Sequence, residues 1–274
     1  MRELADLPDK GILRAEAGRT KFSLTRYAPS EDLAFFVEHY WLTRWDLRGQ
    51  APYRQVILSH PCVNLVFEKG DQGVFTGVHG IRASSDSKLL QGEGTALGIK
   101  FKPGGFYPFW RQPLYRLTGV SVACGELFGM EMSGVEQRLF EQDSGEKMAE
   151  AAEAFLRGRR PASDPQAELA SRIVETAARE RGLAKAADLA AVFGMSLRSL
   201  QRLFGRYVGI SPKWVIRRFR LHEAAQMMEA GEQPDWAQLA HELGYYDQAH
   251  FIKNFKEIVG KSPYNYMRMK GRPL

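Results

Sequence analysis

The sequence has 274 residues, 44% of them hydrophobic and 26% charged, with a formal net charge of +6, which is ordinary for a globular protein of about two domains. It holds no run of the roughly 18 apolar residues that a membrane span needs, and its N-terminus lacks the apolar core of a signal peptide. Two cysteines, Cys62 and Cys124, are too few for a disulfide framework or a cysteine-rich metal site. We therefore expect a cytoplasmic protein without a membrane partner, metal or cofactor.

The first hundred residues are typical of strands. Aromatic and β-branched residues, broken by Gly, Pro and Asp, dominate residues 27–47, 52–70, 73–83 and 95–106. From Pro108 the spacing of apolar residues becomes helical, over 120–130, 133–141 and 145–157. Two prolines in 158–165 indicate a linker, after which everything is helical. These patterns predict an α+β protein: a β-rich domain over 1–160, cupin-like or a half-barrel with trailing helices, and an all-α domain over 161–274.

Two copies of one pattern lie in the helical part. We call residues 187–212 the first unit and residues 237–263 the second unit. In the first part of each unit, equivalent residues are 50 positions apart in the sequence. The pairs are Ala187, Leu189, Ala190 and Gly194 with Ala237, Leu239, Ala240 and Gly244. In the second part of each unit, equivalent residues are 51 positions apart. The pairs are Phe204, Val208, Gly209, Ser211 and Pro212 with Phe255, Val259, Gly260, Ser262 and Pro263. The additional residue falls in a turn, which can absorb it.

Each unit has the pattern of a helix-turn-helix. A short amphipathic helix ends at Gly194 or Gly244, where a positive φ is tolerated, and the next helix begins at an N-cap, Ser196 or Asp247. The second helix buries Leu200, Leu203 and Phe204, or Phe251 and Phe255. It turns polar residues outward: Arg198, Ser199, Gln201 and Arg202, or Gln248, His250 and Lys253. Arg pairs with guanine and Gln with adenine, which favours a DNA-reading helix over a purely structural repeat.

Positive charge gathers in the same part of the chain. Residues 164–274 hold 17 Lys and Arg against 12 Asp and Glu, whereas the preceding residues hold 21 against 20. Between Asp188 and Glu223 there is no acid and there are seven basic residues: Arg198, Arg202, Arg206, Lys213, Arg217, Arg218 and Arg220. This asymmetry indicates a polyanionic partner, although a solvated basic face would have the same composition. Residues 211–229 predict one long helix that joins the two units, with Ser211 as its cap and Pro212 as its first residue.

The last 105 or so residues resemble the DNA-binding domain of the AraC/XylS family of bacterial transcription regulators. LAHELGYYDQAHFIKNFKEIVGKSPYNYMR, residues 239–268, follows the family pattern nearly from end to end. It departs from that pattern at Tyr245, where the family usually has Phe, and at Ala249 and Ile252. The resemblance implies a seven-helix domain that binds double-stranded promoter DNA, with RNA polymerase as a partner and homodimerisation as an option.

By position in the motif, the base-contacting sites of the family fall on Arg198, Gln201, Arg202, Gln248, Ala249, His250 and Lys253, and we add Ser199 from the same exposed face. As candidates for phosphate contacts we take Ser196, Arg206, Lys213 and Lys256. Residues 20–120 resemble a poorly characterised domain that many bacterial regulators carry beside this DNA-binding domain, which implies effector sensing or dimerisation. Its aromatic cluster is expected either to line an effector pocket, with Tyr40, Trp41 and Trp45, or to form a core.

Two enzyme hypotheses compete with a regulator. His39, His60 and His79 are potential metal ligands of a cupin, but they are spread over 40 residues without a paired His motif. Some DNA-repair alkyl-transferases carry this DNA-binding domain beside a nucleophilic cysteine, which makes Cys62 a candidate nucleophile. Cys62 is followed by Val63, Asn64 and Leu65 in an expected strand, and the sequence has no four-cysteine zinc cluster, which favours a structural cysteine and a protein that is not an enzyme. A regulator controlled only by its abundance, without any effector, is a third alternative.

Overall fold

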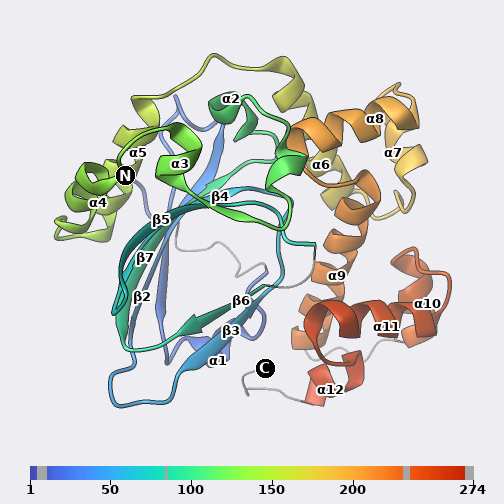
Figure 1. Cartoon of the computed structure of the whole chain (residues 1–274). Coiled ribbons are helices and arrows are strands. Elements are labelled where there is room, and N and C mark those ends of the chain that lie inside the picture. The colour runs from blue at the N-terminus through green and yellow to red at the C-terminus, as the bar shows by residue number, and fades with distance from the viewer. Residues whose placement is uncertain (5–10, 84–85, 231–234, 269–274) are drawn as a thin grey trace.

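The structure is a computed structural model and describes residues 1–4, 11–83, 86–230 and 235–268. Strands fill its N-terminal part and helices its C-terminal part, which confirms the predicted α+β class (Figure 1). The strands are β1 (Ser23–Tyr27), β2 (Val37–Asp46), β3 (Tyr53–Ile57), β4 (Asn64–Gly70), β5 (Gly73–His79), β6 (Asp86–Leu90), β7 (Glu93–Phe101) and β8 (Ser121–Ala123). The helices before residue 160 are α1 (Ala15–Gly18), α2 (Tyr107–Trp110), the 3-10 turn η1 (Leu114–Leu117), α3 (Cys124–Phe128), α4 (Ser133–Phe140) and α5 (Gly145–Arg157).

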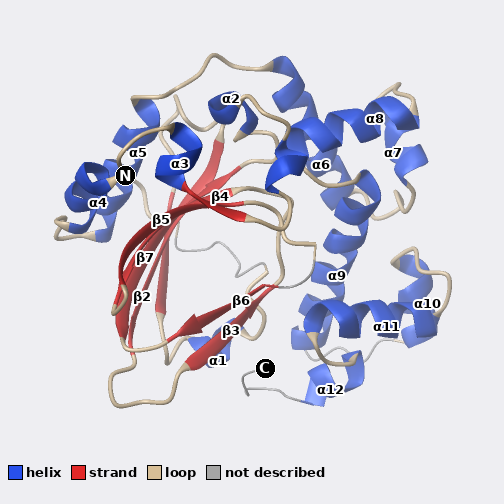
Figure 2. Ribbon diagram, viewed as in Figure 1, coloured by secondary structure: helices blue, strands red, loops and turns tan. Residues whose placement is uncertain are grey.

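The strands form two antiparallel sheets. Six strands pair in the order β1-β2-β7-β4-β5-β8, and β3 pairs with β6 in a separate ribbon. Figure 2 shows the larger sheet curving, with α4 and α5 on its outer side and the ribbon away from them. This arrangement agrees with the predicted half-barrel.

The two faces of the larger sheet bury different residues, because successive side chains of a strand point to opposite faces. Tyr40 of β2 and Phe67 of β4 belong to the core that contains α5, in which the Phe155 ring lies 6.1 Å from that of Phe67. On the other face, Trp41 and Trp45 pack together with residues of the β3–β6 ribbon. Apolar residues on both faces explain why the strands carry continuous runs such as NLVF rather than a clean alternation.

The helical part begins after a segment without regular structure at 158–164. Its helices are α6 (Pro165–Arg179), α7 (Ala186–Val192), α8 (Leu197–Leu203), α9 (Pro212–Ala230), α10 (Trp236–Glu242), α11 (Gln248–Val259) and α12 (Pro263–Arg268). A π-helical turn, Phe204–Val208, extends α8. Figure 1 shows α9 running between α7 and α8 at one end and α10 to α12 at the other. None of the described helices is long and apolar enough to cross a membrane.

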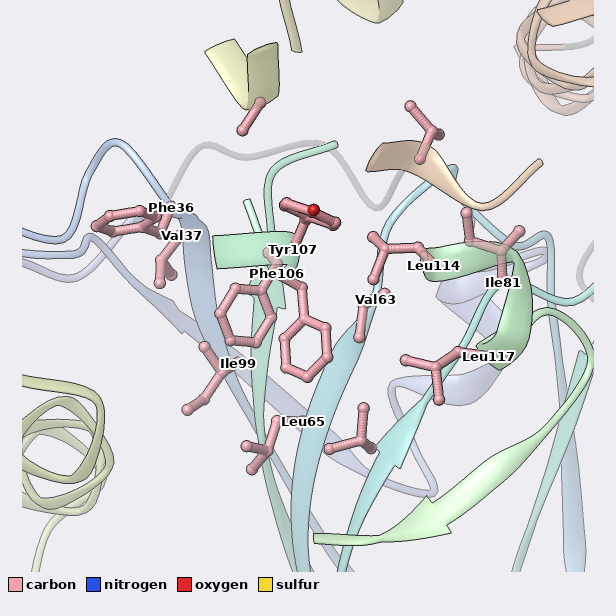
Figure 3. Packing of buried hydrophobic residues seen from close by; sticks show 14 of the residues in the cluster. Phe36, Val37, Val63, Leu65, Ile81, Ile99, Phe106, Tyr107, Leu114 and Leu117 are labelled. Carbon is pink, nitrogen blue, oxygen red and sulfur yellow. The ribbon is translucent and has the colours of Figure 1, made fainter. Parts of the chain in front are cut away.

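The hydrophobic cores do not follow the division into a strand part and a helix part. The first unit shares one apolar cluster with the larger sheet, and Tyr107 and Leu114 belong to that cluster (Figure 3). The second unit packs with α12 and the C-terminal half of α9, and Leu13 and Leu58 of the N-terminal part join its core. Both units are therefore attached to the N-terminal part through buried apolar contacts.

Glycines on β7 make room for the two indoles of β2. A methyl group added at Gly98 would lie 2.0 Å from Cε2 of Trp41, and one at Gly94 would lie 2.1 Å from Cζ2 of Trp45. Both distances are far below van der Waals contact, so a side chain at either glycine forces the indole out of place. The packing of Trp41 and Trp45 on β7 therefore requires glycine at both positions.

Replacing Gly98 with Ala should lower the free energy of unfolding by about 1–3 kcal/mol, because overpacking forces the half-buried Trp41 side chain from its rotamer. Urea denaturation followed by tryptophan fluorescence measures this directly. Gly182→Ala is the matched control, since nothing lies within 4 Å of a methyl group added there. Equal unfolding midpoints for Gly98→Ala and Gly182→Ala would contradict the packing of Trp41 on β7.

Candidate nucleic-acid interface

The first unit turns from α7 into α8 at Gly194, whose φ of 63° is in the left-handed region that favours glycine. Ser196 caps α8, because its Oγ accepts a hydrogen bond of 3.1 Å from the backbone N–H of Ser199. The buried side of α8 carries Leu200 and Leu203, and the π-helical turn adds Phe204; these three side chains are at most 6% exposed. The sequence predicted this glycine, this cap and these core residues, and the structure confirms them.

The second unit repeats the same turn between α10 and α11. Gly244 has a φ of 74°, and the Asp247 carboxylate accepts a 2.7 Å hydrogen bond from the backbone N–H of His250. Phe251 and Phe255 are fully buried on the inner side of α11. The two recognition helices, α8 and α11, are therefore held by the same local devices: a left-handed glycine, an N-cap and buried apolar residues.

Hydrogen bonds fix how the two units correspond. In the first unit, the backbone N–H of Met195 donates to the carbonyl of Ala190 at 2.9 Å. In the second unit, the N–H of Tyr245 donates to the carbonyl of Ala240 at the same distance, so Met195 and Tyr245 occupy equivalent positions. Since Ser196 and Asp247 are both N-caps, the offset changes from 50 to 51 at Tyr246. The helices then pair position by position: Arg198 with Ala249, Ser199 with His250, Gln201 with Ile252, Arg202 with Lys253, and Arg206 with Glu257.

The candidate base contacts lie on the outer faces of the recognition helices. On α8, Arg198, Gln201 and Arg202 are exposed and Ser199 is half-buried. On α11, Gln248, Ala249 and Lys253 are exposed, and the half-buried His250 ring meets Tyr245 edge-on at 5.2 Å. Each helix thus presents polar groups that can hydrogen-bond to base edges, and the α8 face holds two guanidinium groups where α11 holds an alanine and an ammonium group.

Comparison with known proteins adds two family matches. Residues 189–269 match the model of a helix-turn-helix domain, and residues 25–123 match that of a domain of unknown function (DUF6597). Together with the two turns described above, the first match decides the assignment. Residues 189–269 of this chain form a helix-turn-helix domain.

The individual relatives cover different parts of the chain. An uncharacterized HTH-type transcriptional regulator of Haemophilus influenzae is 35% identical over 81 residues, which are 30% of this chain and 27% of the relative. The chain therefore matches about a quarter of that relative. The C-terminal domain of AraT, a response regulator from Geobacillus stearothermophilus, is 23% identical over 36% of this chain and 83% of its own, with a TM-score of 0.33. ToxT from Vibrio cholerae is 13% identical over 91% of this chain and 99% of its own, with a TM-score of 0.38.

The candidate phosphate contacts fall into two groups. Ser196, Lys213 and Lys256 are exposed on the helix-turn-helix domain. Arg206 is exposed as well, but its Nε donates a 2.7 Å hydrogen bond to the hydroxyl of Tyr107, and its guanidinium lies 5.1 Å from the centre of that ring. It therefore ties the first unit to the N-terminal domain. The repeat itself held this signal, since the position equivalent to Arg206 is Glu257, an acid that would repel phosphate.

The basic run also divides within α9. Arg217 is half-exposed, whereas Arg218 and Arg220 are each 1% exposed. Arg218 Nη2 donates to the carbonyl of Ala83 at 2.6 Å, and Arg220 Nη2 donates to that of Glu180 at 2.6 Å. Both guanidinium groups bind inside the protein, so neither adds to the positive surface that the composition had indicated.

The predicted effector-pocket residues do not form one wall. Tyr40 is fully buried toward α5, its hydroxyl lies 3.3 Å from Glu153 Oε1, and burial raises its pKa above the usual range. Trp41 and Trp45 lie on the opposite face of β2. Trp41 is the half-buried member of the trio, and its Nε1 donates to Asn64 Oδ1 at 3.4 Å. The face that remains a candidate effector site therefore carries Trp41 and Trp45 and excludes Tyr40.

The residues of the two enzyme hypotheses occupy separate places. His39 lies beside Glu38, His60 stacks on His222 with ring centres 4.4 Å apart, and the His79 ring meets Ser121 Oγ at 2.8 Å. Within the described ranges, no three His, Cys, Asp or Glu side chains are grouped so that they could hold a metal ion. The Cys62 side chain is buried, and desolvation raises its pKa to about 12. This environment disfavours the thiolate that a nucleophilic cysteine needs.

Alkylation should reflect this environment. In the native protein at pH 8, iodoacetamide should modify Cys62 and Cys124 much more slowly than in urea, because both thiols are buried and burial raises each pKa to about 12. Because the thiolate is the reactive form, the native rate should still be rising with pH at values where an ordinary thiol, with a pKa of about 8.5, has already reached its plateau. Mass spectrometry after timed quenching measures both rates. A Cys62 that reacts faster in the native protein than in urea would restore the alkyl-transferase hypothesis.

Proposed function

We propose that this protein is a sequence-specific, DNA-binding transcription regulator of the AraC type. The observation that carries the proposal is the repeated unit, because the chain holds two recognition helices on one connecting helix, each with base-reading side chains on its exposed face. Two helices joined in this way can occupy successive major-groove faces about 34 Å apart. Exposed cations such as Lys213 and Lys256 supply sequence-independent affinity through phosphate contacts, and the recognition helices supply specificity.

The N-terminal domain would act as the regulatory part. The half-buried Trp41, beside Trp45 on the inner face of the larger sheet, offers an aromatic surface to a small apolar or planar effector. The family resemblance further supports RNA polymerase as a partner, homodimerisation and a cytoplasmic location. A DNA-repair alkyl-transferase, the main rival, is disfavoured by the buried Cys62 thiol with its raised pKa.

Selection from a random pool of duplex DNA, using the full chain, tests this function. We expect one enriched sequence, bound more weakly by about tenfold or more when the salt is raised from about 50 to about 200 mM, because bound Lys and Arg release counterions from phosphates. An unenriched pool would overturn sequence-specific binding. Enrichment with an affinity that is independent of salt would overturn the phosphate contribution.

Arg202→Ala should lower affinity for the selected sequence by about 1–3 kcal/mol and relax the preference at one base pair, as expected for a lost bidentate contact to guanine. Binding to the full set of single-base variants of the site measures both effects. The control is Arg54→Ala, which removes the same charge from an exposed position on β3. A loss that is uniform over all variants would reassign Arg202 to phosphate.

The first recognition helix should dominate specificity. Its Arg198 and Gln201 correspond to Ala249 and Ile252 of α11, which cannot make the same hydrogen bonds to bases. A single-base effect from His250→Ala that is larger than any from α8 would give the leading role to α11.

A further inference from the structure

The second unit contains one residue that the first unit lacks, and the hydrogen bonds identify it. Met195 and Tyr245 close equivalent turns, and the next residue in the first unit, Ser196, is already the N-cap. In the second unit Tyr246 stands between Tyr245 and the N-cap Asp247. The first unit therefore forms the same glycine turn and the same capped helix without any counterpart of Tyr246. The fold of the unit does not require this tyrosine.

The Tyr246 side chain contributes little to the packing of the protein. It is 93% exposed, more than any other large apolar side chain in the described part of the chain; the next are Tyr264 at 62% and Tyr115 and Val192 at 59%. A tyrosine combines a large rigid apolar ring with a hydroxyl, a combination that is common at binding surfaces. A residue inserted into a turn and left in solvent is thus a candidate for contact with a partner.

The position of Tyr246 indicates which partner. It comes directly before the N-cap of α11, and in a helix-turn-helix the N-terminal end of the recognition helix enters the major groove. The turn before it then lies at the groove edge, where the phosphates run. The two units also differ in charge at this edge, because the N-cap is the neutral Ser196 in the first and the acid Asp247 in the second. A neutral donor beside Asp247 can still bind phosphate at a point where the acid alone would repel it.

We propose that Tyr246 is a DNA-contacting residue that positions the second recognition helix. Its hydroxyl donates a hydrogen bond to a phosphate oxygen at the edge of the major groove, and its ring packs on the adjoining deoxyribose. Tyrosine is one of the side chains that make such backbone contacts in protein–DNA complexes. The inference rests on the proposed function, and it gives α11, which has fewer base-pairing groups than α8, an anchor of its own.

Binding of the full chain to its selected DNA sequence tests this role. Tyr246→Ala should weaken binding by about three- to tenfold, the size of one net hydrogen bond with its apolar contact, and Tyr246→Phe should lose part of that. The loss should be uniform over single-base variants of the site, since a phosphate carries no sequence information. The dependence of affinity on salt should not change, because a neutral side chain releases no counterion.

The controls separate the possible outcomes. Tyr115→Ala removes a comparably exposed tyrosine from η1 and should leave DNA affinity unchanged. The melting temperature of Tyr246→Ala should equal that of the parent, because the side chain is exposed. Parental affinity in both Tyr246 variants would overturn the inference while the proposed function stands, and a loss confined to one base pair would overturn the phosphate contact. A parent protein that selects no sequence would overturn the proposed function itself, and the inference with it.

Discussion

The position of the two helix-turn-helix units relative to each other depends on α9, the helix that joins them. This helix packs against the rest of the protein with two buried arginine side chains, Arg218 and Arg220. Val215 and Ile216, in its N-terminal half, belong to the core that the first unit shares with the larger sheet. Leu221 and Ala224, further along, belong to the core of the second unit. Between these two cores lies Arg218, which is 1% exposed. The spacing of the two recognition helices is thus set by a helix whose middle contains a buried cation.

The two buried arginines of α9 differ in how well the protein satisfies them. Arg220 donates to the Glu180 carbonyl at 2.6 Å and pairs with Glu223 at 3.2 Å, so its charge is compensated and fastens α9 to the end of α6. Arg218 donates to the Ala83 carbonyl and stacks on Trp214, but its Nε and Nη1 have no hydrogen-bond partner among the described residues. Desolvation lowers its pKa to about 10, so it stays charged at pH 7. Burying a cation that lacks some of its hydrogen bonds costs free energy. The contact of Arg218 with the N-terminal domain is therefore less stabilising than its buried surface area alone would suggest.

Local features of the helix-turn-helix domain were predictable because they depend on nearby residues. A glycine that ends a helix, a Ser or Asp cap and apolar residues at helical spacing act within one or two turns, so Gly194, Asp247 and Phe255 could be assigned from the sequence. The position of Tyr40 was predictable in principle, since neighbours on a strand point to opposite faces, yet grouping it with Trp41 by aromatic character ignored that rule. The partners of Arg206 and Arg218 were not predictable from their charges, because these partners, Tyr107 and Ala83, lie on segments far away in the sequence.

Contacts between the two domains bear on how an effector could act on DNA binding. The N-terminal domain holds the first unit through the Tyr107 hydroxyl on Arg206 and through Thr118, whose hydroxyl donates to the Gly209 carbonyl. It holds α12, which packs with the second unit, at a different place, where the Arg14 guanidinium lies 4.2 Å from the centre of the Tyr266 ring. The N-terminal domain thus restrains the positions of both recognition helices.

Under the proposed function, two linked recognition helices would bind DNA as a bivalent ligand, so their joint affinity would depend on whether both can engage at once. A shift of either contact that changes the spacing would reduce binding to that of one unit, whereas a shift that moves both units together would have no effect. An effector at the site proposed near Trp41 would therefore be coupled to DNA only to the extent that it moved one contact relative to the other. The well-satisfied Tyr107–Arg206 contact and the poorly satisfied Arg218 contact differ in strength. Of these two contacts, the one at Arg218 would be the easier to displace, and its displacement would change the spacing of the second unit relative to the first.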